Sequence, residues 1–507
     1  MHHAIQRSRL RARAVLVGSF ALAGLLTACA GGAGPRPPEP EAPGRLTLEP
    51  GDRILVLAPH PDDEVLCCGG VLQEAVARGL PVRVVFLTYG DSNEWSFLAY
   101  RKRPEVTPRA ARALGEVRRR EALAAADRLG VPRDRLTFLG YPDHGTLSIL
   151  LSHWGKRPPY RGPLTRARAV PYATALRPGA PYEGEQVLAD LESVLRNFRP
   201  TKVFLPHPAD HHPDHAALYL FARVALWDLA EGGDGAAAAT TTLQPYLVHF
   251  PGWPRPAGGH PELALDPPRA LAAVGRWRRF PLTEEQERVK SEALRAHRTQ
   301  YGYSARRLLP FVRTNELFGN LPTVVLDAGD APVLRDEEGR AEDALEVPED
   351  LLGAVADHFV GLESLRPELG GDRLRLSVRL DQPLRGPARL DLFLLGYRAG
   401  RPFAAMPKLD VRVGEAAVSV FDRGVRRGSG DVEVRREDDG QEILVDVPRA
   451  ALGDPDRCLL GAETSSDLLP LDRVSWRVLE LPPPAPAPGS DPASESVGST
   501  DLRPRVL

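Results

Sequence analysis

The sequence has few cysteines and almost no net charge. Four cysteines in 507 residues are too few to build a fold on disulfides. Basic side chains (65) and acidic side chains (67) nearly balance, so the net charge gives no argument for a nucleic-acid partner, and we expect none. No internal repeat is present either. The length exceeds what a single hydrophobic core usually serves, so we expect two folded domains.

The N-terminal apolar stretch, Ala14–Leu26, is too short to span a bilayer comfortably as a mature helix. Arginines precede it, and Leu26-Thr27-Ala28-Cys29 closes it. This layout is typical of a secretory signal, and its last four residues resemble the bacterial lipoprotein box, whose cysteine is lipidated after cleavage. An ordinary cleaved signal is the alternative. We predict a signal peptide over residues 1–28, lipidation of Cys29, and an exported protein anchored at the periplasmic face of an outer membrane.

A Gly/Pro/Ala-rich tether covers residues 29–45. The rest of the chain shows two different sequence patterns, one after the other. Strands alternate with helices over residues 46–328, which predicts an α/β fold with a layered, mostly parallel sheet. The last elements expected there are a strand over Tyr246–Phe250 and a helix over Thr283–Thr299. Apolar residues recur at every second position over residues 372–481, which predicts a smaller all-β sandwich. Its segment Val445–Gly453 resembles carbohydrate-binding sandwich modules, and a plain interaction or stabilising domain is the alternative. We expect a linker over residues 329–371 and a disordered tail over residues 482–507.

Two short motifs rich in histidine and aspartate each follow an apolar strand. The first strand, Ile54–Leu57, runs into Pro59-His60-Pro61-Asp62-Asp63-Glu64, and a helical pattern begins at Val65. The second strand runs into His207-Pro208-Ala209-Asp210-His211-His212-Pro213-Asp214-His215. In parallel sheets, ligands bind beyond the carboxyl ends of the strands, and both motifs fall at that edge. The two motifs therefore predict one metal site built from two loops.

The residue types at this edge are sufficient for hydrolysis. His60 and Asp63 are three residues apart on a tight turn, so both side chains can converge on one ion. Two imidazoles and one carboxylate, with a position left for water, are a common way of holding catalytic zinc. A carboxylate beside that water can take its proton. Each residue taken singly also has a plainer interpretation, since a His–Asp pair is often a surface ion pair and acids complement a helix N-terminus.

Together the two motifs resemble those of the PIG-L (LmbE-like) family of zinc-dependent N-acetylglucosaminyl deacetylases, over roughly residues 50 to 320. The resemblance implies a Rossmann-like fold and hydrolysis of an N-acetyl group on an N-acetylglucosamine-type sugar, glycan or glycoconjugate. It implies Zn²⁺ as cofactor, with Fe²⁺ or another divalent ion as the alternative. By motif position it assigns the metal ligands to His60, Asp63 and His215.

The same resemblance implies roles for further side chains. Asp62 would be the general base, His212 would stabilise the oxyanion or donate a proton, and Asp214 would orient a neighbouring imidazole. Arg118 and Asp143 resemble substrate-binding positions, although a solvated helix face and a turn are their plainer interpretations. Three residues resemble positions that orient the metal ligands: His207, Asp210 and His211.

Three other functions stay open at this point. A related amide hydrolase would act on a different N-acyl substrate. A 2-His-1-carboxylate iron(II) oxygenase would use the same ligand types, but Asp62 beside the site favours hydrolysis, and only a hydrolase would turn over without oxygen. A glycan-binding lipoprotein would bind without turnover. The sequence does not fix the sugar, the role of the β domain or the oligomeric state.

Overall fold

The computed structural model describes residues 42–92, 107–232, 240–327, 332–335, 359–428, 432–466 and 469–483. The predicted signal peptide, Cys29, most of the tether and nearly all of the predicted tail lie outside these residues. The described residues belong to one compact unit. Among the described helices, none combines the length and the hydropathy that crossing a membrane requires.

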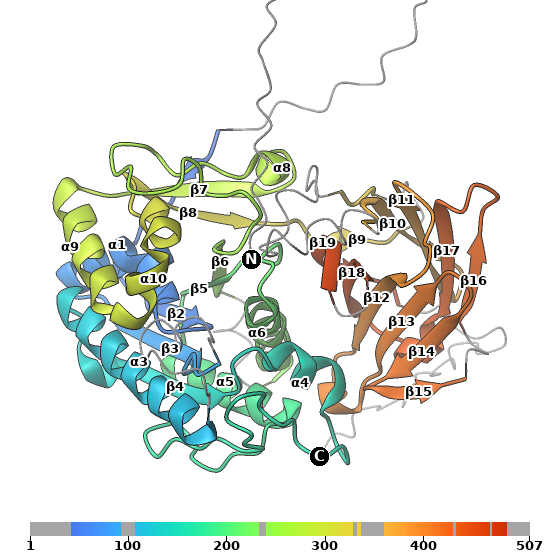
Figure 1. Ribbon diagram of the computed structural model, residues 1–507, viewed down its shortest axis with the longest axis horizontal. Coiled ribbons are helices and arrows are strands. Elements are labelled where there is room, and N and C mark those ends of the chain that lie inside the picture. Colours follow the sequence, from blue (N-terminus) through green and yellow to red (C-terminus); the bar gives the residue numbers. More distant parts are fainter. Residues whose placement is uncertain are drawn as a thin grey trace, which may run out of the picture. The chain divides into compact units, whose positions relative to one another are not determined.

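The α/β part is organised around a five-stranded, entirely parallel sheet in the order β4-β3-β2-β5-β6, as predicted (Figure 1). Its central strand, β2 (Ile54–Ala58), is buried at every position. Continuous apolar runs of this kind are typical of parallel strands that are covered on both faces. The other strands are β3 (Val82–Thr88), β4 (Leu136–Tyr141), β5 (Lys202–Pro206) and β6 (Thr242–Tyr246).

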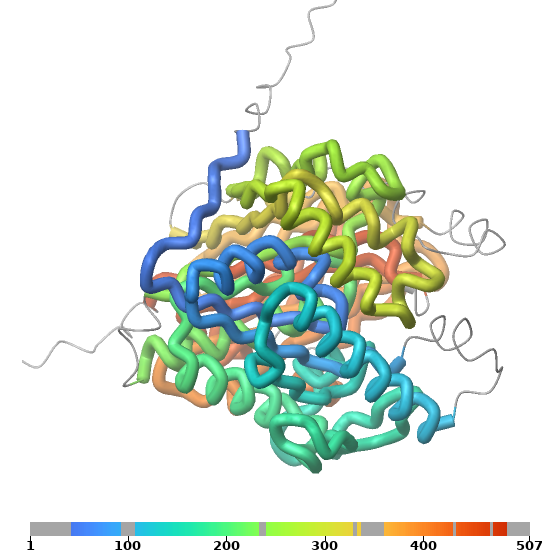
Figure 2. The backbone as a smooth tube through the Cα atoms, turned by 90° about the vertical axis from the view of Figure 1, so that its left-hand side faces the viewer, coloured from blue at the N-terminus to red at the C-terminus, as the bar shows by residue number. Residues whose placement is uncertain are grey.

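Helices cover both faces of this sheet. α1 (Asp63–Ala77) and α3 (Pro108–Arg128) follow β2 and β3 and both pack against α9 (Glu284–Ala296). Figure 2 shows α3 in cyan beside the yellow segment of α9 and α10 (Arg298–Leu308). α5 (Gly184–Phe198) packs against α6 (Pro213–Glu231), which also contacts β5 and the short α4 (Thr146–Ser152). Strand order reverses between β2 and β5, which makes the carboxyl ends of these two strands the switch point where ligands bind in such folds.

Two local predictions in the α/β part were wrong, and one small sheet was not predicted. The predicted strand Tyr246–Phe250 begins earlier, because β6 pairs with β5 over Thr242–Tyr246. One helix predicted over Thr283–Thr299 is two, because the backbone of His297 leaves the helical region between α9 and α10. A small sheet was missed: β1 (Gly44–Arg45), β7 (Arg276–Pro281) and β8 (Asn315–Asn320), whose strands carry too many polar residues for a clear strand pattern.

The C-terminal part consists of strands, as predicted, in two sheets. β10 (Leu362–Gly370), β11 (Arg373–Leu380), β17 (Glu442–Pro448) and β16 (Glu433–Arg436) form a four-stranded antiparallel sheet. The predicted linker over residues 329–371 thus contains β10. The seven-stranded sheet has the order β15-β14-β13-β12-β18-β19-β9. Its strands are β9 (Val324–Val325), β12 (Ala388–Tyr397), β13 (Lys408–Gly414), β14 (Val418–Asp422), β15 (Val425–Arg427), β18 (Arg457–Ser466) and β19 (Leu469–Glu480).

One hydrophobic core joins the α/β part to the seven-stranded sheet. Leu395, Tyr397, Leu459 and Trp476 of that sheet belong to the core that surrounds the parallel strands. The Tyr397 hydroxyl donates to Asp228 Oδ1 at 3.0 Å, near the C-terminal end of α6. The two parts are therefore packed together through apolar contacts that neither could bury alone.

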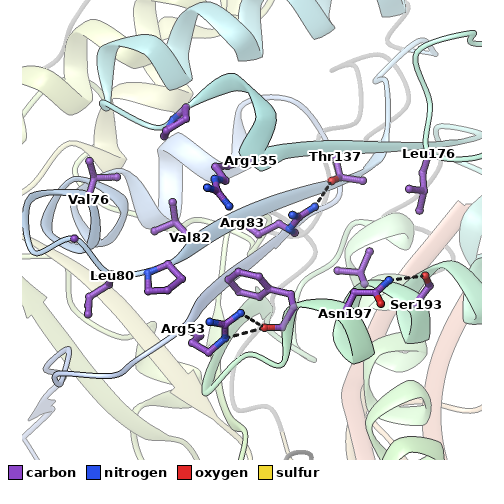
Figure 3. A pocket seen from close by; sticks show the side chains of 15 residues that line it. Arg53, Val76, Leu80, Val82, Arg83, Arg135, Thr137, Leu176, Ser193 and Asn197 are labelled. Atoms are coloured by element: carbon purple, nitrogen blue, oxygen red, sulfur yellow. Dashed lines mark hydrogen bonds between the residues drawn. The ribbon is translucent and has the colours of Figure 1, made fainter.

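A pocket at the amino ends of β2 and β3 is unsuited to the predicted chemistry (Figure 3). Its polar lining includes Arg53, Arg83 and Arg135 and no carboxylate or imidazole. Two of these arginines lie over the ring of Phe198, at 4.9 and 5.7 Å from its centroid. The two motifs rich in histidine and aspartate lie at the opposite, carboxyl edge of the parallel sheet.

Candidate metal centre

The first loop turns sharply between β2 and α1. Asp62 occupies the N-cap position of α1 with φ = 133°, a backbone conformation that residues other than glycine rarely adopt. Strain of this kind persists only where surrounding contacts hold it, and it is concentrated at functional sites. The Asp62 amide donates to Glu64 Oε2 at 2.8 Å, and Glu64 Oε1 lies 2.9 Å from His297 Nε2. All three side chains are buried.

Arg118 holds the same turn from α3. Its Nη2 donates to the Pro61 carbonyl at 2.8 Å and lies 3.4 Å from Asp62 Oδ1, while Nη1 donates to the Gly90 carbonyl at 2.9 Å. The side chain is buried. Its observed contacts are thus with the loop that carries Asp62. The predicted contact between Arg118 and substrate stays a prediction.

The second loop delivers His212 and His215 from the start of α6. His212 is the N-cap residue, and its Nδ1 accepts from the Asp214 amide at 3.2 Å. His215, in the first turn of the helix, is fully buried, with Nδ1 3.0 Å from Asp210 Oδ2. A carboxylate on one ring nitrogen of histidine fixes the ring so that the other nitrogen can face a metal. Asp210 therefore lies where the predicted orienting role requires it.

The two loops meet on Asp63. Its Oδ2 lies 3.3 Å from His60 Nδ1 and 3.3 Å from His215 Nε2. Ring nitrogens of His60, His212 and His215 lie within 4.8 Å of one another. The structure thus brings together the three predicted ligands, the predicted base and His212.

Asp143 and Asp214 also lie at the site, next to His60. Asp143 Oδ1 and Asp214 Oδ2 lie 3.2 and 3.3 Å from His60 Nε2. Asp214 also accepts from the amides of His144 at 2.6 Å and Thr146 at 3.0 Å, so it ties α6 to the loop after β4. Asp143 accepts from the Ser92 amide at 2.8 Å. Its predicted contact with substrate stays a prediction, because the observed contacts of Asp143 are with protein groups.

Burial and close charges shift the pKa values of these groups in opposite directions. Burial raises the pKa of Asp62 to about 7, although the Arg118 charge opposes the shift. Burial also disfavours the ionised form of Asp63, yet His215 holds the pKa of this carboxyl well below its usual range. Burial lowers the pKa of His212 well below its usual value, and the neighbouring His60 adds to this effect. Asp62 thus titrates near neutral pH, while His212 is neutral.

The donor set fits a divalent cation. Asp63, Asp143, Asp210 and Asp214 are all at most 2% exposed and surround the imidazoles of His60 and His215. Buried carboxylates require compensating positive charge. Imidazole and carboxylate donors in this combination suit Zn²⁺ and, with open positions, Fe²⁺. The cluster is therefore able to bind a metal.

Two residues of the second motif lie away from the cluster centre. His207 is buried and stacks on Trp277 with ring centroids 5.2 Å apart. The ring of His211 lies against Phe250, with centroids 5.6 Å apart. Both contacts are structural, and the predicted orienting roles of these two residues stay predictions.

Three histidines near the site were missed by the sequence analysis. The His249 ring lies 4.8 Å from that of His215, and Asp63, His215 and His249 form a second group that could hold an ion. The His144 ring lies 4.7 Å from that of His212. His297 supports Glu64. His144 and His249 each follow a strand at the carboxyl edge of the sheet, and this position was the usable signal, whereas His297 had none.

Fold and site together define an α/β protein with an imidazole–carboxylate centre at the switch point of a parallel sheet. Residues 55–226, from β2 to α6, match the model of the PIG-L family, described as GlcNAc-PI de-N-acetylase. Over these residues, which contain both histidine- and aspartate-rich motifs, the chain is similar to the PIG-L family.

The chain is also similar to proteins with a described activity. A 1D-myo-inositol 2-acetamido-2-deoxy-alpha-D-glucopyranoside deacetylase of Mycobacterium sp. (strain KMS) is 33% identical over 165 residues, which are 32% of this chain and 46% of that protein. The chain thus spans about half the length of the first relatives that it matches. The protein of that name from Mycolicibacterium vanbaalenii is 27% identical over 58% of this chain and 96% of its own length. N,N'-diacetylchitobiose deacetylase from Pyrococcus horikoshii is 19% identical with a TM-score of 0.33, covering 53% of this chain and 83% of that one.

Proposed function

We propose that this protein is a metal-dependent hydrolase that removes the N-acetyl group from an N-acetylglucosamine-type sugar, glycan or glycoconjugate. The observation that carries the proposal is the buried Asp62 carboxyl beside the imidazole–carboxylate cluster. The match of residues 55–226 to the PIG-L family model supports it, as does similarity to relatives named as deacetylases of a 2-acetamido-2-deoxy sugar.

His60, Asp63 and His215 would hold the cation, with Zn²⁺ as the first choice and Fe²⁺ or another divalent ion as the alternative. A cation bound there would polarise the amide carbonyl and lower the pKa of a water molecule. Asp210 keeps His215 oriented through the 3.0 Å contact at Nδ1. The carboxyl groups of Asp143 and Asp214 lie next to His60 Nε2.

Asp62 would take the proton from the attacking water. A carboxyl that titrates at about 7 is matched to this task near neutral pH. His212 would donate a hydrogen bond to the oxyanion. Because its Nδ1 accepts from the Asp214 amide, the proton of the neutral ring lies on Nε2. Asp62 would thus move the proton of the water, and His212 would stabilise the negative charge on the oxyanion.

The test is acetate release from N-acetylglucosamine oligomers by the zinc-loaded protein and by its Asp62→Asn variant. We expect the variant to lose a factor of about 10²–10⁴ in kcat while it keeps its metal. Metal content is measured by elemental analysis on the same samples. Asp134→Asn, at an exposed aspartate, is the matched control. Equal rates for Asp62→Asn and the unmodified protein would rule out Asp62 as the base, and no release by either would rule out this substrate class.

The anchor and the β part stay proposals. We infer export and lipidation at Cys29 from the sequence of the first 29 residues. Cell fractionation tests this inference, since Cys29→Ser would move the protein from the membrane to the soluble fraction. We also propose that the two sheets of the C-terminal part, which share a second hydrophobic core, form a sandwich.

A further inference from the structure

We propose that the outer face of the seven-stranded sheet binds the glycan chain beyond the sugar that is deacetylated. This inference rests on the proposed function, and it names the class of substrate as an oligosaccharide. The surface consists of two neighbouring cross-strand rows, which we call the aromatic row and the charged row.

The aromatic row runs across five strands. Phe393 on β12 pairs with Gly461 on β18 and with Asp410 on β13, and Asp410 pairs with Phe421 on β14. Directly paired residues share one face of a sheet. The ring of Trp476 lies over Gly461, where an added Cβ would meet it at 2.9 Å, and stacks on Phe393 with centroids 5.8 Å apart. Phe393 and Phe421 are both partly exposed.

The charged row lies two residues along each strand. Asp391 pairs with Glu463 on β18 and with Arg412 on β13, and Glu463 pairs with Arg473 on β19. Arg412 Nη2 lies 2.7 Å from Asp410 Oδ2, and its guanidinium lies 4.5 Å over the Phe421 ring. Asp410 Oδ1 is buried and accepts no hydrogen bond from the described residues. This surface offers carboxylate and guanidinium groups beside aromatic rings.

The aromatic row borders the interface, because Trp476 belongs to the core shared with the α/β part and Phe393 packs against that core. On the next row towards the α/β part, Leu395 and Leu459 are fully buried, and Lys408 Nζ lies 4.2 Å from the centroid of the Trp154 ring. One row further, Tyr397 contacts Asp228 near the C-terminal end of α6. The aromatic row is four residues from Tyr397, about 13 Å along β12 at the rise of a strand. The rows therefore emerge from the interface towards the opposite end of α6.

That end of α6 carries the candidate metal centre. The Arg473 guanidinium of the charged row donates to the His211 carbonyl at 2.9 Å. The Trp476 amide donates to the Pro208 carbonyl at 3.1 Å. Both carbonyls belong to the loop that delivers His212 and His215. The surface is thus continuous with one wall of the site.

A sugar chain matches this surface in chemistry. A pyranose has an apolar C–H face and a rim of hydroxyls, so it is recognised by exposed aromatic rings flanked by charged hydrogen-bonding groups. Specific sites generally combine apolar and aromatic lining with a few placed polar groups. Phe393 and Phe421 supply partly exposed rings, and Arg412 and Glu463, which are also partly exposed, supply groups for hydroxyls.

The test compares substrates of different length on the full chain. We measure kcat/KM for acetate release from N-acetylglucosamine dimer and hexamer, with the unmodified protein, Phe393→Leu and Phe421→Leu. Leucine keeps apolar volume and removes the ring, so folding is preserved and is checked by thermal unfolding. We expect the hexamer to be preferred by the unmodified protein, and each variant to lower the hexamer-to-dimer ratio about three- to tenfold.

Arg412→Ala and Arg375→Ala form a matched pair. Both arginines lie on outer sheet faces beside a carboxylate that is 3% exposed, Asp391 and Asp446 respectively. Arg375 belongs to the other sheet. We expect Arg412→Ala to lower the length preference and Arg375→Ala to leave it unchanged.

Equal kcat/KM for dimer and hexamer in the unmodified protein, or unchanged ratios in the Phe393 and Phe421 variants, would overturn the inference. If the unmodified protein releases no acetate, the proposed function fails, and calorimetric titration with the hexamer decides on the surface. Binding that is weakened by Phe393→Leu and unaffected by Arg375→Ala would support the surface. Absence of hexamer binding would overturn it.

Discussion

Asp62 combines an unusual backbone conformation with an unusual ionisation. Its φ of 133° presents the carboxyl beside the cluster, while Glu64 and Arg118 hold the turn from both sides. Burial favours the protonated acid and Arg118 favours the carboxylate, which leaves the pKa near 7. The same contacts therefore hold the geometry of the turn and tune the chemistry of the side chain.

Asp210 should matter through His215 rather than through substrate. In Asp210→Asn the charge opposite His215 Nδ1 is lost, and the amides of His212, Val248 and His249 lose their carboxylate acceptor. We expect zinc affinity to fall about 10- to 100-fold, as for other residues that orient metal ligands. Competition with a chromophoric chelator measures the affinity. Asp134→Asn serves as the control, and an unchanged affinity in Asp210→Asn would contradict the assignment.

Lys408 should make stability depend on pH. Burial, with a smaller contribution from Arg423, lowers the pKa of its ammonium from 10.5 to about 7 in the folded protein. Between these pH values the unfolded chain binds more protons, so the free energy of unfolding rises with pH, by at most about 1.4 kcal/mol per unit.

The rise in the free energy of unfolding should be complete above pH 10.5, the pKa of Lys408 in the unfolded chain. It should be absent below about pH 7, the pKa of Lys408 in the folded protein. Chemical unfolding from pH 6.5 to 10 tests this expectation. Lys408→Met should flatten the dependence, while Lys156→Met, at an exposed lysine, should not. Parallel curves for Lys408→Met and the unmodified protein would contradict it.

The sequence identified the side chains of the site better than their partners. His60, Asp62, Asp63 and His215 were predicted because two dense motifs follow two strands. His249 and His297 were not, because each stands alone in its segment and reaches the site only through tertiary packing. Arg118 was placed on the correct helix, but no local pattern revealed that its guanidinium would bind the Pro61 and Gly90 carbonyls.

The break between α9 and α10 links two distant elements to the first loop. His297 lies at this break, and its imidazole contacts Glu64 at the start of α1. A continuous helix over this segment would follow from the sequence pattern, because the pattern contains no proline or glycine at the break. The contact of 2.9 Å between Glu64 Oε1 and His297 Nε2 holds the chain at this break.

A double-mutant cycle on Glu64 and His297 measures this link. Removing one partner of a buried charged pair leaves the other uncompensated, so His297→Ala and Glu64→Ala should each cost about 3–5 kcal/mol in the free energy of unfolding. The double variant should cost clearly less than their sum. Urea unfolding provides the values. Additive costs would show that the two side chains do not interact energetically.

Among the strands, prediction succeeded where burial produced a simple pattern. The continuous apolar run of β2 was recognisable because both faces of this strand are buried. The alternation of apolar and polar residues in β11 was recognisable because only one face of this strand is buried. β7 was missed, since arginines occupy its exposed positions and only Trp277 and Phe280 are inward-facing large residues. Its place in a sheet is set by pairing with β8 and β1, which no local pattern encodes.

The division into an α/β part and a β part was predictable, but the way they pack was not. Tyr397, Leu459 and Trp476 look like ordinary strand residues, yet they complete the core around the parallel sheet. The surface proposed for the glycan exists only in this arrangement, because its distance from the metal centre is set by the contacts of α6 at both ends.

Residues 42–327 expressed alone should be markedly less stable than the full chain. Separation exposes Trp154 and Trp227 and other apolar side chains that the β part covers. We expect a lower unfolding temperature and binding of a hydrophobic dye, whereas the full chain should unfold in one cooperative transition. Differential scanning calorimetry compares the two. Two separate transitions of the full chain, one matching that of residues 42–327, would contradict the shared core.

The meeting of the two loops on Asp63 has a consequence for how the chain is held together. The strands that precede the loops are adjacent in space but far apart in sequence, so an ion shared by His60 and His215 would act as a removable cross-link. Closing a long loop in this way restricts the unfolded ensemble much as a disulfide does. A chain whose described cysteines are all unpaired could thus obtain from a cation the staple that its thiols do not provide.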